Sequence, residues 1–286
     1  MARRKDLNYD EVIEKIMEKK EFRKLPLSDV KLVYSQFEDR EDLILDEKIK
    51  ETRDLLRKMY TAFVSEKLLN VKDKEPIWFL QKHISTKERL NHYIDVYKKC
   101  LDGLDEVHHE ELIEPNYISA KDKLTKGGII NVYDLGSGIN GFSYDYFLEA
   151  GFNVNYFGFE AVGQLVDLQN NYFLKEKKNA DCFHGSLFDL EIVKSFLKKG
   201  KGKKVVFLFK TLDSLEMLKR NYSKELLKEI MPFVDRVVVS WATKSLVSKK
   251  NFYAERKWLK DFIKENYKII DEFQEGIENY LIFENK

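Results

Sequence analysis

The sequence predicts an α/β fold in which helices come first and a doubly wound, mostly parallel sheet follows. Glycine is the first observation, since residues 1–102 contain none and 12 of the 13 glycines follow residue 126. A glycine-free segment rich in Leu, Lys and Glu is typical of helices. The second observation is that apolar runs alternate with helical patterns after residue 126, as in repeated βα units. We therefore expect a helical domain at 1–126 and an α/β domain at 127–286.

Composition narrows the class of protein. Of the 286 residues, 43% are hydrophobic, which is enough to offset the entropy of ordering the chain and excludes a disordered protein. No apolar run approaches the roughly 20 residues of a membrane span, and the first residues lack the apolar run of a signal peptide. We expect a cytoplasmic protein with no membrane contact. Cys100 and Cys182 are too few for a disulfide framework or a zinc site, so no metal is expected.

Apolar residues at helical spacing predict helices within 12–17, 30–37 and 49–60. The segment HISTKERL follows at residues 83–90. Its Ser85 and Glu88 match a capping box, in which the hydroxyl accepts from a backbone N–H and the carboxylate reaches back. We expect the helix that begins there to continue through Leu101.

Five apolar runs rich in Val and Phe predict strands that are buried on both faces. These runs are 128–138, 153–161, 180–188, 203–210 and 236–243. The segments YKIIDEF and NYLIFEN near the end of the sequence predict a closing hairpin.

The sharpest local motif is Asp134-Leu135-Gly136-Ser137-Gly138, between a predicted strand and a predicted helix. Small residues at such a turn let a ligand approach the backbone at the carboxyl edge of the sheet. Glu160 ends the next strand, where an acid can accept hydrogen bonds from ribose hydroxyls. The alternative is an ordinary glycine-containing turn with a surface glutamate. D-x-G-x-G with a strand-terminal acid resembles the Rossmann-like class I methyltransferases, which implies a seven-stranded sheet and S-adenosyl-L-methionine as cofactor.

Several absences exclude other reactions. No Gly-Lys-Ser/Thr follows the turn, which argues against a P-loop kinase. No Asn-Pro-Pro-Tyr segment follows the fourth predicted strand, which argues against methylation of an adenine amino group. Cys100 lies in a predicted helix and Cys182 in a predicted strand, so both are expected to be buried structural residues rather than nucleophiles.

Four segments carry a narrower resemblance. HISTKERL, FKTLDSLE at 209–216, VSWATKSL at 239–246 and ENYLIF near the end are similar to segments of the aminoglycoside-resistance methyltransferases of 16S ribosomal RNA, the Arm/Kgm group. The order of segments agrees over roughly residues 10–284. Those enzymes methylate N7 of a guanine in the decoding-site helix. The resemblance implies an rRNA methyltransferase whose partner is ribosomal RNA or the small ribosomal subunit.

The resemblance also implies roles for individual residues. Arg89 would pair with the methionine carboxylate, because a guanidinium matches a carboxylate in shape. The implied cofactor-binding residues are His83, Ser85, Thr86, Arg89, Gly136, Ser137, Gly138, Glu160, Gly185, Ser186 and Phe209. Lys210 would lie near the sulfonium and the incoming base and help position it, and no acid–base pair is expected. Because N7 methylation gives the product a positive charge, Asp213 or Glu216 is a hypothetical electrostatic partner. The alternative is that these are acids favoured at a helix N-terminus. Gly185 stands where the family has an acid beside the adenine amino group, and Asp189 is the candidate replacement.

Because the net charge is only +1, RNA binding must come from local clusters of basic and aromatic residues. The candidate RNA-binding residues are Lys244, Lys249, Lys250, Arg256, Arg3 and Arg4. The alternative for any single lysine is a solvated helix face. Two other functions stay open: a methyltransferase acting on a small molecule or a protein, and a non-catalytic ribosome-binding factor that keeps the fold.

Overall fold

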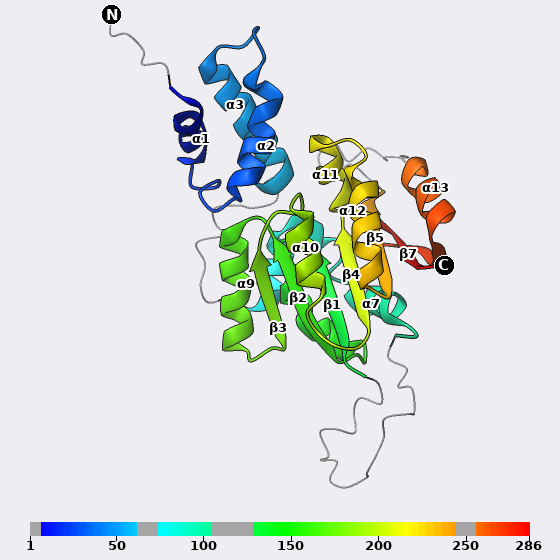
Figure 1. Cartoon of the computed structure of the whole chain (residues 1–286). Coiled ribbons are helices and arrows are strands. Elements are labelled where there is room, and N and C mark those ends of the chain that lie inside the picture. Colours follow the sequence, from blue (N-terminus) through cyan, green and yellow to red (C-terminus); the bar gives the residue numbers. More distant parts are fainter. Residues whose placement is uncertain (1–6, 62–73, 105–127, 244–255) are drawn as a thin grey trace, which may run out of the picture.

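The structure is a computed structural model that describes residues 7–61, 74–104, 128–243 and 256–286. Its centre is a seven-stranded sheet with the strand order β3-β2-β1-β4-β5-β7-β6 (Figure 1). The strands are β1 (Ile130–Leu135), β2 (Val154–Glu160), β3 (Ala180–His184), β4 (Lys204–Phe209), β5 (Arg236–Ala242), β6 (Lys268–Glu275) and β7 (Glu278–Glu284). The first five are parallel, and β7 runs antiparallel to β5 and β6. The predicted mostly parallel sheet and closing hairpin are confirmed.

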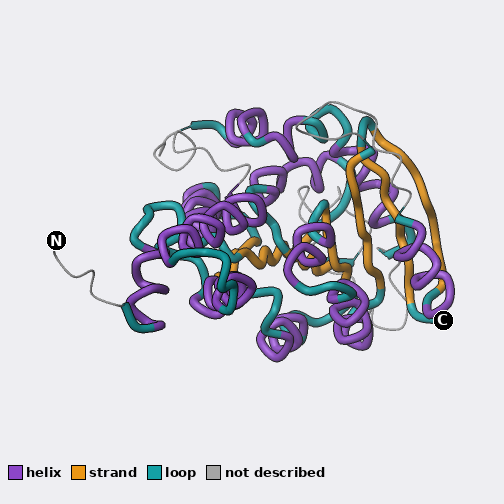
Figure 2. Tube along the Cα trace, turned by 90° about the horizontal axis from the view of Figure 1, so that it is seen from above, coloured by secondary structure: helices purple, strands orange, loops and turns teal. Residues whose placement is uncertain are grey.

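Helices lie on both sides of the sheet, as the view from above shows (Figure 2). The helices that follow the strands are α8 (Tyr144–Glu149), α9 (Gly163–Lys175), α10 (Leu190–Leu197), α11 (Leu212–Leu218), α12 (Tyr222–Ile230) and α13 (Lys257–Asn266), with short 3₁₀ turns η4 (Asn140–Ser143) and η5 (Met231–Phe233). Side chains of α8 and α9 join the core on one face, and those of α10, α12 and α13 join the core on the other. Both faces of the central strands are therefore buried, which explains their near-continuous apolar sequence.

The N-terminal helices form a group beside the carboxyl ends of the first strands (Figure 1). They are α1 (Tyr9–Met17), α2 (Leu27–Glu38), α3 (Leu45–Leu56) and a π-helical turn, η1 (Arg57–Thr61). Val12, Ile16, Val30 and Val33 are buried where these helices pack together. The backbone N–H of Gly163 in α9 donates to the carbonyl of Lys24 at 3.0 Å, which ties the loop before α2 to the sheet domain.

A second group of helices from the front half packs directly on the sheet domain. It comprises α5 (Pro76–Lys82), α6 (Ile84–Lys87) and α7 (Tyr93–Leu101). The ring of Tyr97 in α7 stacks on Phe147 of α8 with 3.7 Å between centroids. The expected domain boundary near residue 126 lies outside the described residues, but α7 already shares the core of the sheet. In the described part of the chain no helix has the length and apolar character to cross a membrane.

Two sequence-based boundaries are wrong. The helix predicted to run from HISTKERL to Leu101 is broken, because α6 ends at Lys87 and α7 begins at Tyr93, so Arg89 lies in the connecting turn. The third strand was predicted to reach residue 188, but it ends at His184. A turn follows there, in which the backbone N–H of Asp189 donates to the carbonyl of Ser186 at 3.1 Å and leads the chain into α10.

Candidate active site

One cavity lies at the carboxyl ends of the parallel strands, beside the point where the strand order reverses between β1 and β4. Open α/β sheets bind ligands at such a point. Residues that follow four strands line the cavity, and residues of the N-terminal helices and of the turn after α6 complete its wall. The lining includes Asp29, Tyr60, His83, Ser85, Thr86, Arg89, Asp134, Gly136, Ser137, Gly138, Glu160, Leu187, Phe188, Phe209, Lys210 and Thr211.

The glycine turn after β1 forms the floor of this cavity. Gly136 and Gly138 have φ angles of 76° and 55°, a left-handed conformation that glycine adopts without strain. A Cβ on Gly136 would also lie 2.8 Å from the Thr211 side chain, so only glycine fits there. The turn is held by the backbone N–H of Gly136, which donates to the carbonyl of Phe159 at 2.8 Å. The predicted turn is confirmed, and it exposes backbone rather than side chain to the cavity.

Glu160 closes the turn from the end of β2. One carboxylate oxygen accepts from the backbone N–H of Gly138 and the other from that of Val162, both at 2.8 Å. Burial raises the pKa of Glu160, while these backbone donors oppose the rise. The side chain is 8% exposed and lines the cavity. Glu160 is therefore a buried residue of the cavity at the end of β2 rather than an ordinary surface glutamate, and its role toward a cofactor stays a prediction.

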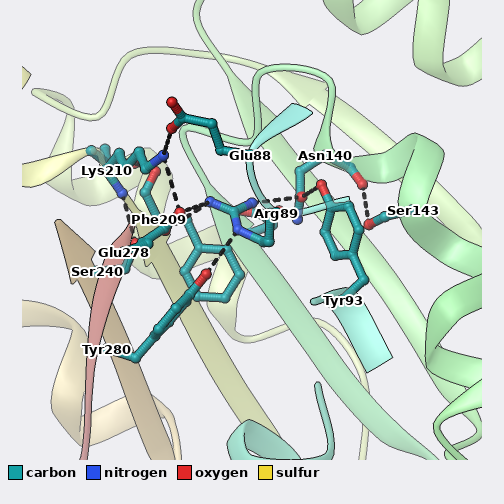
Figure 3. A network of polar contacts seen from close by, with 12 residues as sticks. Glu88, Arg89, Tyr93, Asn140, Ser143, Phe209, Lys210, Ser240, Glu278 and Tyr280 are labelled. Atoms are coloured by element: carbon teal, nitrogen blue, oxygen red, sulfur yellow. Dashed lines mark hydrogen bonds and ion pairs between the residues drawn. The ribbon is translucent and has the colours of Figure 1, made fainter. Parts of the chain in front are cut away.

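Arg89 lines the same cavity and is held by three polar neighbours (Figure 3). Its Nη2 donates to both oxygens of Glu278 at 2.8 and 3.1 Å, and its Nε donates to the hydroxyl of Tyr280 at 3.0 Å. Its Nη1 donates to Oδ1 of Asn140 at 3.0 Å. The guanidinium also hydrogen-bonds to the Tyr93 side chain, and it lines the cavity.

Asn140 connects this network to the motif after β1. Its Nδ2 donates to Asp134 at 2.8 Å, and the hydroxyl of Tyr156 donates to the same carboxylate oxygen at 2.8 Å. Burial raises the pKa of Asp134, and the two donors oppose the rise. The hydroxyl of Tyr93 donates to Asn140 at 2.8 Å. The first residue of the D-x-G-x-G motif thus positions the asparagine that orients Arg89.

Phe209 and Lys210 end β4 at the same cavity. The Arg89 guanidinium lies 4.6 Å from the centroid of the Phe209 ring, a cation–π contact. Lys210 has a φ of 56°, and its Nζ lies 3.1 Å from Glu278 and 3.3 Å from Glu88. Burial raises the pKa of Glu278, but the charges of Arg89 and Lys210 outweigh burial, so that the net shift is downward. The structure brings the predicted positioning lysine to the site.

The segment from His83 to Thr86 forms part of the wall, but not as a capping box. His83 is the N-cap of α6, with no side-chain capping bond, and Ser85 lies inside the helix. Thr86 instead donates from its hydroxyl to the carbonyls of Leu80 at 2.8 Å and His83 at 3.1 Å. Burial, helped by Arg89 and Lys210, lowers the pKa of His83 to about 4, so the ring is neutral at pH 7.

Four residues predicted from the sequence are not part of the cavity lining. Gly185 and Ser186 do not line the cavity, whereas Leu187 and Phe188 do. Gly185 packs against the Phe159 ring, which would lie 2.5 Å from an added Cβ. The carboxylate of Glu216 accepts from two backbone N–H groups at the start of α12, at 2.6 and 2.8 Å, so it serves the helix rather than the cavity. Asp189 caps α10 by accepting from Ile192.

The candidate RNA-binding residues Arg3, Arg4, Lys244, Lys249 and Lys250 lie outside the described residues. Arg256 is described, and its Nη2 lies 2.6 Å from Asp213 at the start of α11.

Sequence reasoning missed several polar residues of the site, among them Asn140, which orients Arg89. Asp29 and Tyr60 come from the N-terminal helices, and Glu278 starts β7. The hydroxyl of Tyr60 donates to Asp29 at 2.7 Å. The sequence contains one indication that Asp29 is buried, because it stands four residues before Val33 and therefore on the apolar face of a predicted helix.

Among the comparisons with known proteins, those with solved structures identify the fold. Neither the models of protein families nor the curated protein sequences match the chain. Solved structures do match: the 16S rRNA methyltransferase RmtF in complex with S-adenosyl-L-homocysteine is 17% identical with a TM-score of 0.71, covering 98% of this chain and 100% of that one. The 16S rRNA methylase RmtB is 17% identical with a TM-score of 0.72, covering 99% and 100%.

An rRNA methylase from Escherichia coli is also 17% identical, with a TM-score of 0.70 and coverage of 98% and 100%. The likeness runs through the N-terminal helices as well as the sheet, because almost the whole of both chains is covered. The chain therefore has the fold of these rRNA methyltransferases from its N-terminal helices to its C-terminal hairpin.

Proposed function

We propose that the protein is an S-adenosyl-L-methionine-dependent methyltransferase of 16S ribosomal RNA that modifies N7 of a guanine. The observation that carries the proposal is that the glycine turn, Glu160 and the buried Arg89 all line one cavity. These groups come from separate segments, and each has a partner in the chemistry of that cofactor. The solved structure of RmtF, which has this fold, holds S-adenosyl-L-homocysteine.

The residues present fit the cofactor. Glu160 suits the ribose hydroxyls, since a carboxylate has about four lone-pair sites and the backbone of Gly138, Val162 and Ala161 takes three of them. The cationic guanidinium of Arg89 lines the cavity and suits the methionine carboxylate in charge and shape. The Phe209 ring at the end of β4 already contacts the Arg89 guanidinium and stacks on Phe207, so it offers the sulfonium an apolar wall at the cavity. The backbone of Gly136 and Gly138 leaves room between these groups.

The bound cofactor supplies an electrophilic methyl group on sulfur. Guanine N7 offers a lone pair and carries no proton, so the protein has to align N7, the methyl carbon and sulfur but does not have to remove a proton. The new N–C bond uses the N7 lone pair, and the electrons of the broken S–C bond stay on sulfur. The neutral state of His83 at pH 7 avoids an additional cation beside a base that becomes positively charged.

The test has two stages. Calorimetry with S-adenosyl-L-homocysteine is expected to show one binding site per chain. Incubation of small ribosomal subunits with methyl-labelled cofactor, followed by mapping of the modified nucleotide, is expected to place label on one guanine of 16S rRNA. Cells that express the protein and contain methylated subunits are then tested for their sensitivity to aminoglycosides.

The alternatives give different results in the same experiments. A methyltransferase of small molecules or proteins binds the cofactor but leaves subunits unlabelled. A ribosome-binding factor without activity associates with subunits and does not bind S-adenosyl-L-homocysteine. Label on a base atom other than guanine N7 keeps the enzyme class and overturns the assignment of the atom.

A further inference from the structure

Asp29 is a buried carboxylate that the chemistry described so far does not use. It lies in the first turn of α2, is 1% exposed, and lines the cavity. Burial raises its pKa, and neighbouring hydroxyl groups oppose that rise. Burying a carboxylate is costly unless its oxygens are bonded, so the arrangement around it indicates which lone pairs are used.

Three hydroxyl groups surround Asp29. Tyr60 donates to Oδ2 at 2.7 Å and Ser28 donates to Oδ1 at 3.2 Å. Ser186, which follows β3, also hydrogen-bonds to the carboxylate and accepts from the backbone N–H of Phe188 at 3.0 Å. A carboxylate has about four lone-pair sites, so these three described donors leave one acceptor site at the cavity.

The position of Asp29 relative to the expected ribose site indicates which part of a bound nucleoside Asp29 would contact. Glu160 ends β2, Arg89 and Phe209 lie toward β1 and β4, and Asp29 bonds to the segment after β3. A nucleoside whose ribose lies at Glu160 and whose sulfonium lies at Phe209 must extend its base in the other direction along the sheet edge. That direction leads to Leu187, Phe188 and Asp29.

The other acids do not serve this end of the cavity. Among its described lining residues the carboxylates are Asp29, Asp134 and Glu160. Asp134 binds Asn140 and Tyr156, and Glu160 binds the glycine turn. Asp189, the sequence-based candidate for the adenine amino group, caps α10 instead.

We propose that Asp29 accepts a hydrogen bond from the 6-amino group of the adenine ring, so that a helix outside the sheet domain recognises the base. The inference rests on the proposed function, because it assumes the adenosyl cofactor. Its consequence is that the cofactor bridges α2 and the sheet. Specificity for adenine then depends on how the N-terminal helices are docked, since Gly163 and Lys24 hold the loop before α2 against α9.

The experiment compares two ligands on the full chain by calorimetry: S-adenosyl-L-homocysteine and its analogue that lacks the 6-amino group. Wild-type protein is expected to prefer the amino compound by about 10- to 100-fold, the value of a hydrogen bond to a charged group. Asp29→Ala is expected to reduce the preference to about 3-fold or less. The ratio of affinities separates recognition from a structural role, because general loosening weakens both ligands alike.

Asp189→Asn is the matched control, since asparagine also caps a helix and the ratio is expected to stay at the wild-type value. If Asp29→Ala does not fold, Asp29→Asn is measured, with an expected ratio below wild type because the charge is lost. A wild-type ratio near one, or an unchanged ratio in the Asp29 variants, overturns the assignment of Asp29 and leaves the proposed function intact. If wild-type protein binds neither ligand, the proposed function itself fails and this inference fails with it.

Discussion

The guanidinium of Arg89 and the carboxylate of Glu278 form a buried ion pair in which Nη2 lies 2.8 Å from Oε1. The two side chains are 2% and 4% exposed and are separated by 189 positions in the sequence. Lys210 contacts the other carboxylate oxygen at 3.1 Å, so Glu278 lies between two cations, and Lys210 also pairs with Glu88. Strand β7, the last strand in the sequence, therefore holds the arginine that lines the cavity.

Loss of Arg89 is expected to be costly for stability. Arg89→Ala leaves Glu278 buried with only Lys210 as a cation, and the free energy of unfolding is expected to fall by about 3 kcal/mol in urea denaturation. Arg40→Ala is the control, because Arg40 forms an exposed pair with Asp42, and a change of about 0.5 kcal/mol is expected. Equal effects of the two variants would contradict the importance of the buried pair.

Glu160→Gln is expected to weaken the binding of S-adenosyl-L-homocysteine by about 10-fold or more. A ribose hydroxyl then meets a neutral amide instead of a charged acceptor. Calorimetry measures the affinity, and circular dichroism checks the fold. Glu149→Gln changes an exposed acid of α8 and is expected to bind as the wild type does. Unchanged affinity in Glu160→Gln would remove this residue from the cofactor site.

Gly185→Ala is expected to destabilise the fold without a specific effect on the cofactor. The added Cβ would lie 2.5 Å from the ring of Phe159, and relief of this overlap costs about 1–3 kcal/mol. Gly128→Ala is the control, because a Cβ there meets no atom within 4 Å. Urea denaturation measures both. A selective loss of cofactor affinity with full stability in Gly185→Ala would restore the family-based role for this position.

The depressed pKa of His83 predicts a pH dependence of stability. The unfolded histidine binds a proton below about 6.5, whereas the folded ring does so only near 4. Its contribution is therefore complete above about pH 6.5 and is lost as the pH falls toward 4. From pH 7.5 to 5, wild-type protein is expected to lose about 2 kcal/mol more unfolding free energy than His83→Gln. Parallel pH profiles of the two proteins would refute this burial effect.

Basic residues between the N-terminal helices are expected to bind RNA phosphates rather than the cofactor. Lys19 and Arg23 are exposed between α1 and α2. The double variant Lys19→Glu/Arg23→Glu is expected to reduce methylation of small subunits and to lower the salt dependence of binding, because each phosphate contact releases counterions. Affinity for S-adenosyl-L-homocysteine is expected to stay unchanged. Lys175→Glu, on exposed α9, is the control, and an equal loss there would mean that the effect is nonspecific.

The parts of the site that the sequence predicts are those determined by local backbone requirements. The turn at Gly136 and Gly138 needs positive φ angles after a strand, and Glu160 ends the next parallel strand, so both are visible as short patterns. The capping box at Ser85 fails because its motif is equally compatible with a position inside a helix. In the structure α6 begins after His83, and the hydroxyl of Thr86 donates back to the carbonyl of Leu80 in α5.

The residues that the sequence did not predict are brought together by tertiary contacts. Asp29 and Tyr60 are 31 positions apart and meet only when α2 packs against η1. Glu278 reaches Arg89 because β7 inserts between β5 and β6, a strand order that short motifs do not encode. Gly185 was misassigned because its alignment to a family position did not reveal the Phe159 ring beside it.

The antiparallel insertion of β7 sets an order of events during protein synthesis. Arg89 leaves the ribosome long before Glu278 and Tyr280, its two partners on β7, have been translated. Until then the arginine has to remain hydrated, because a lone cation in that interior would be unfavourable. The Arg89 side of the cavity therefore reaches the arrangement described above only after β7 has been translated and has paired with β5.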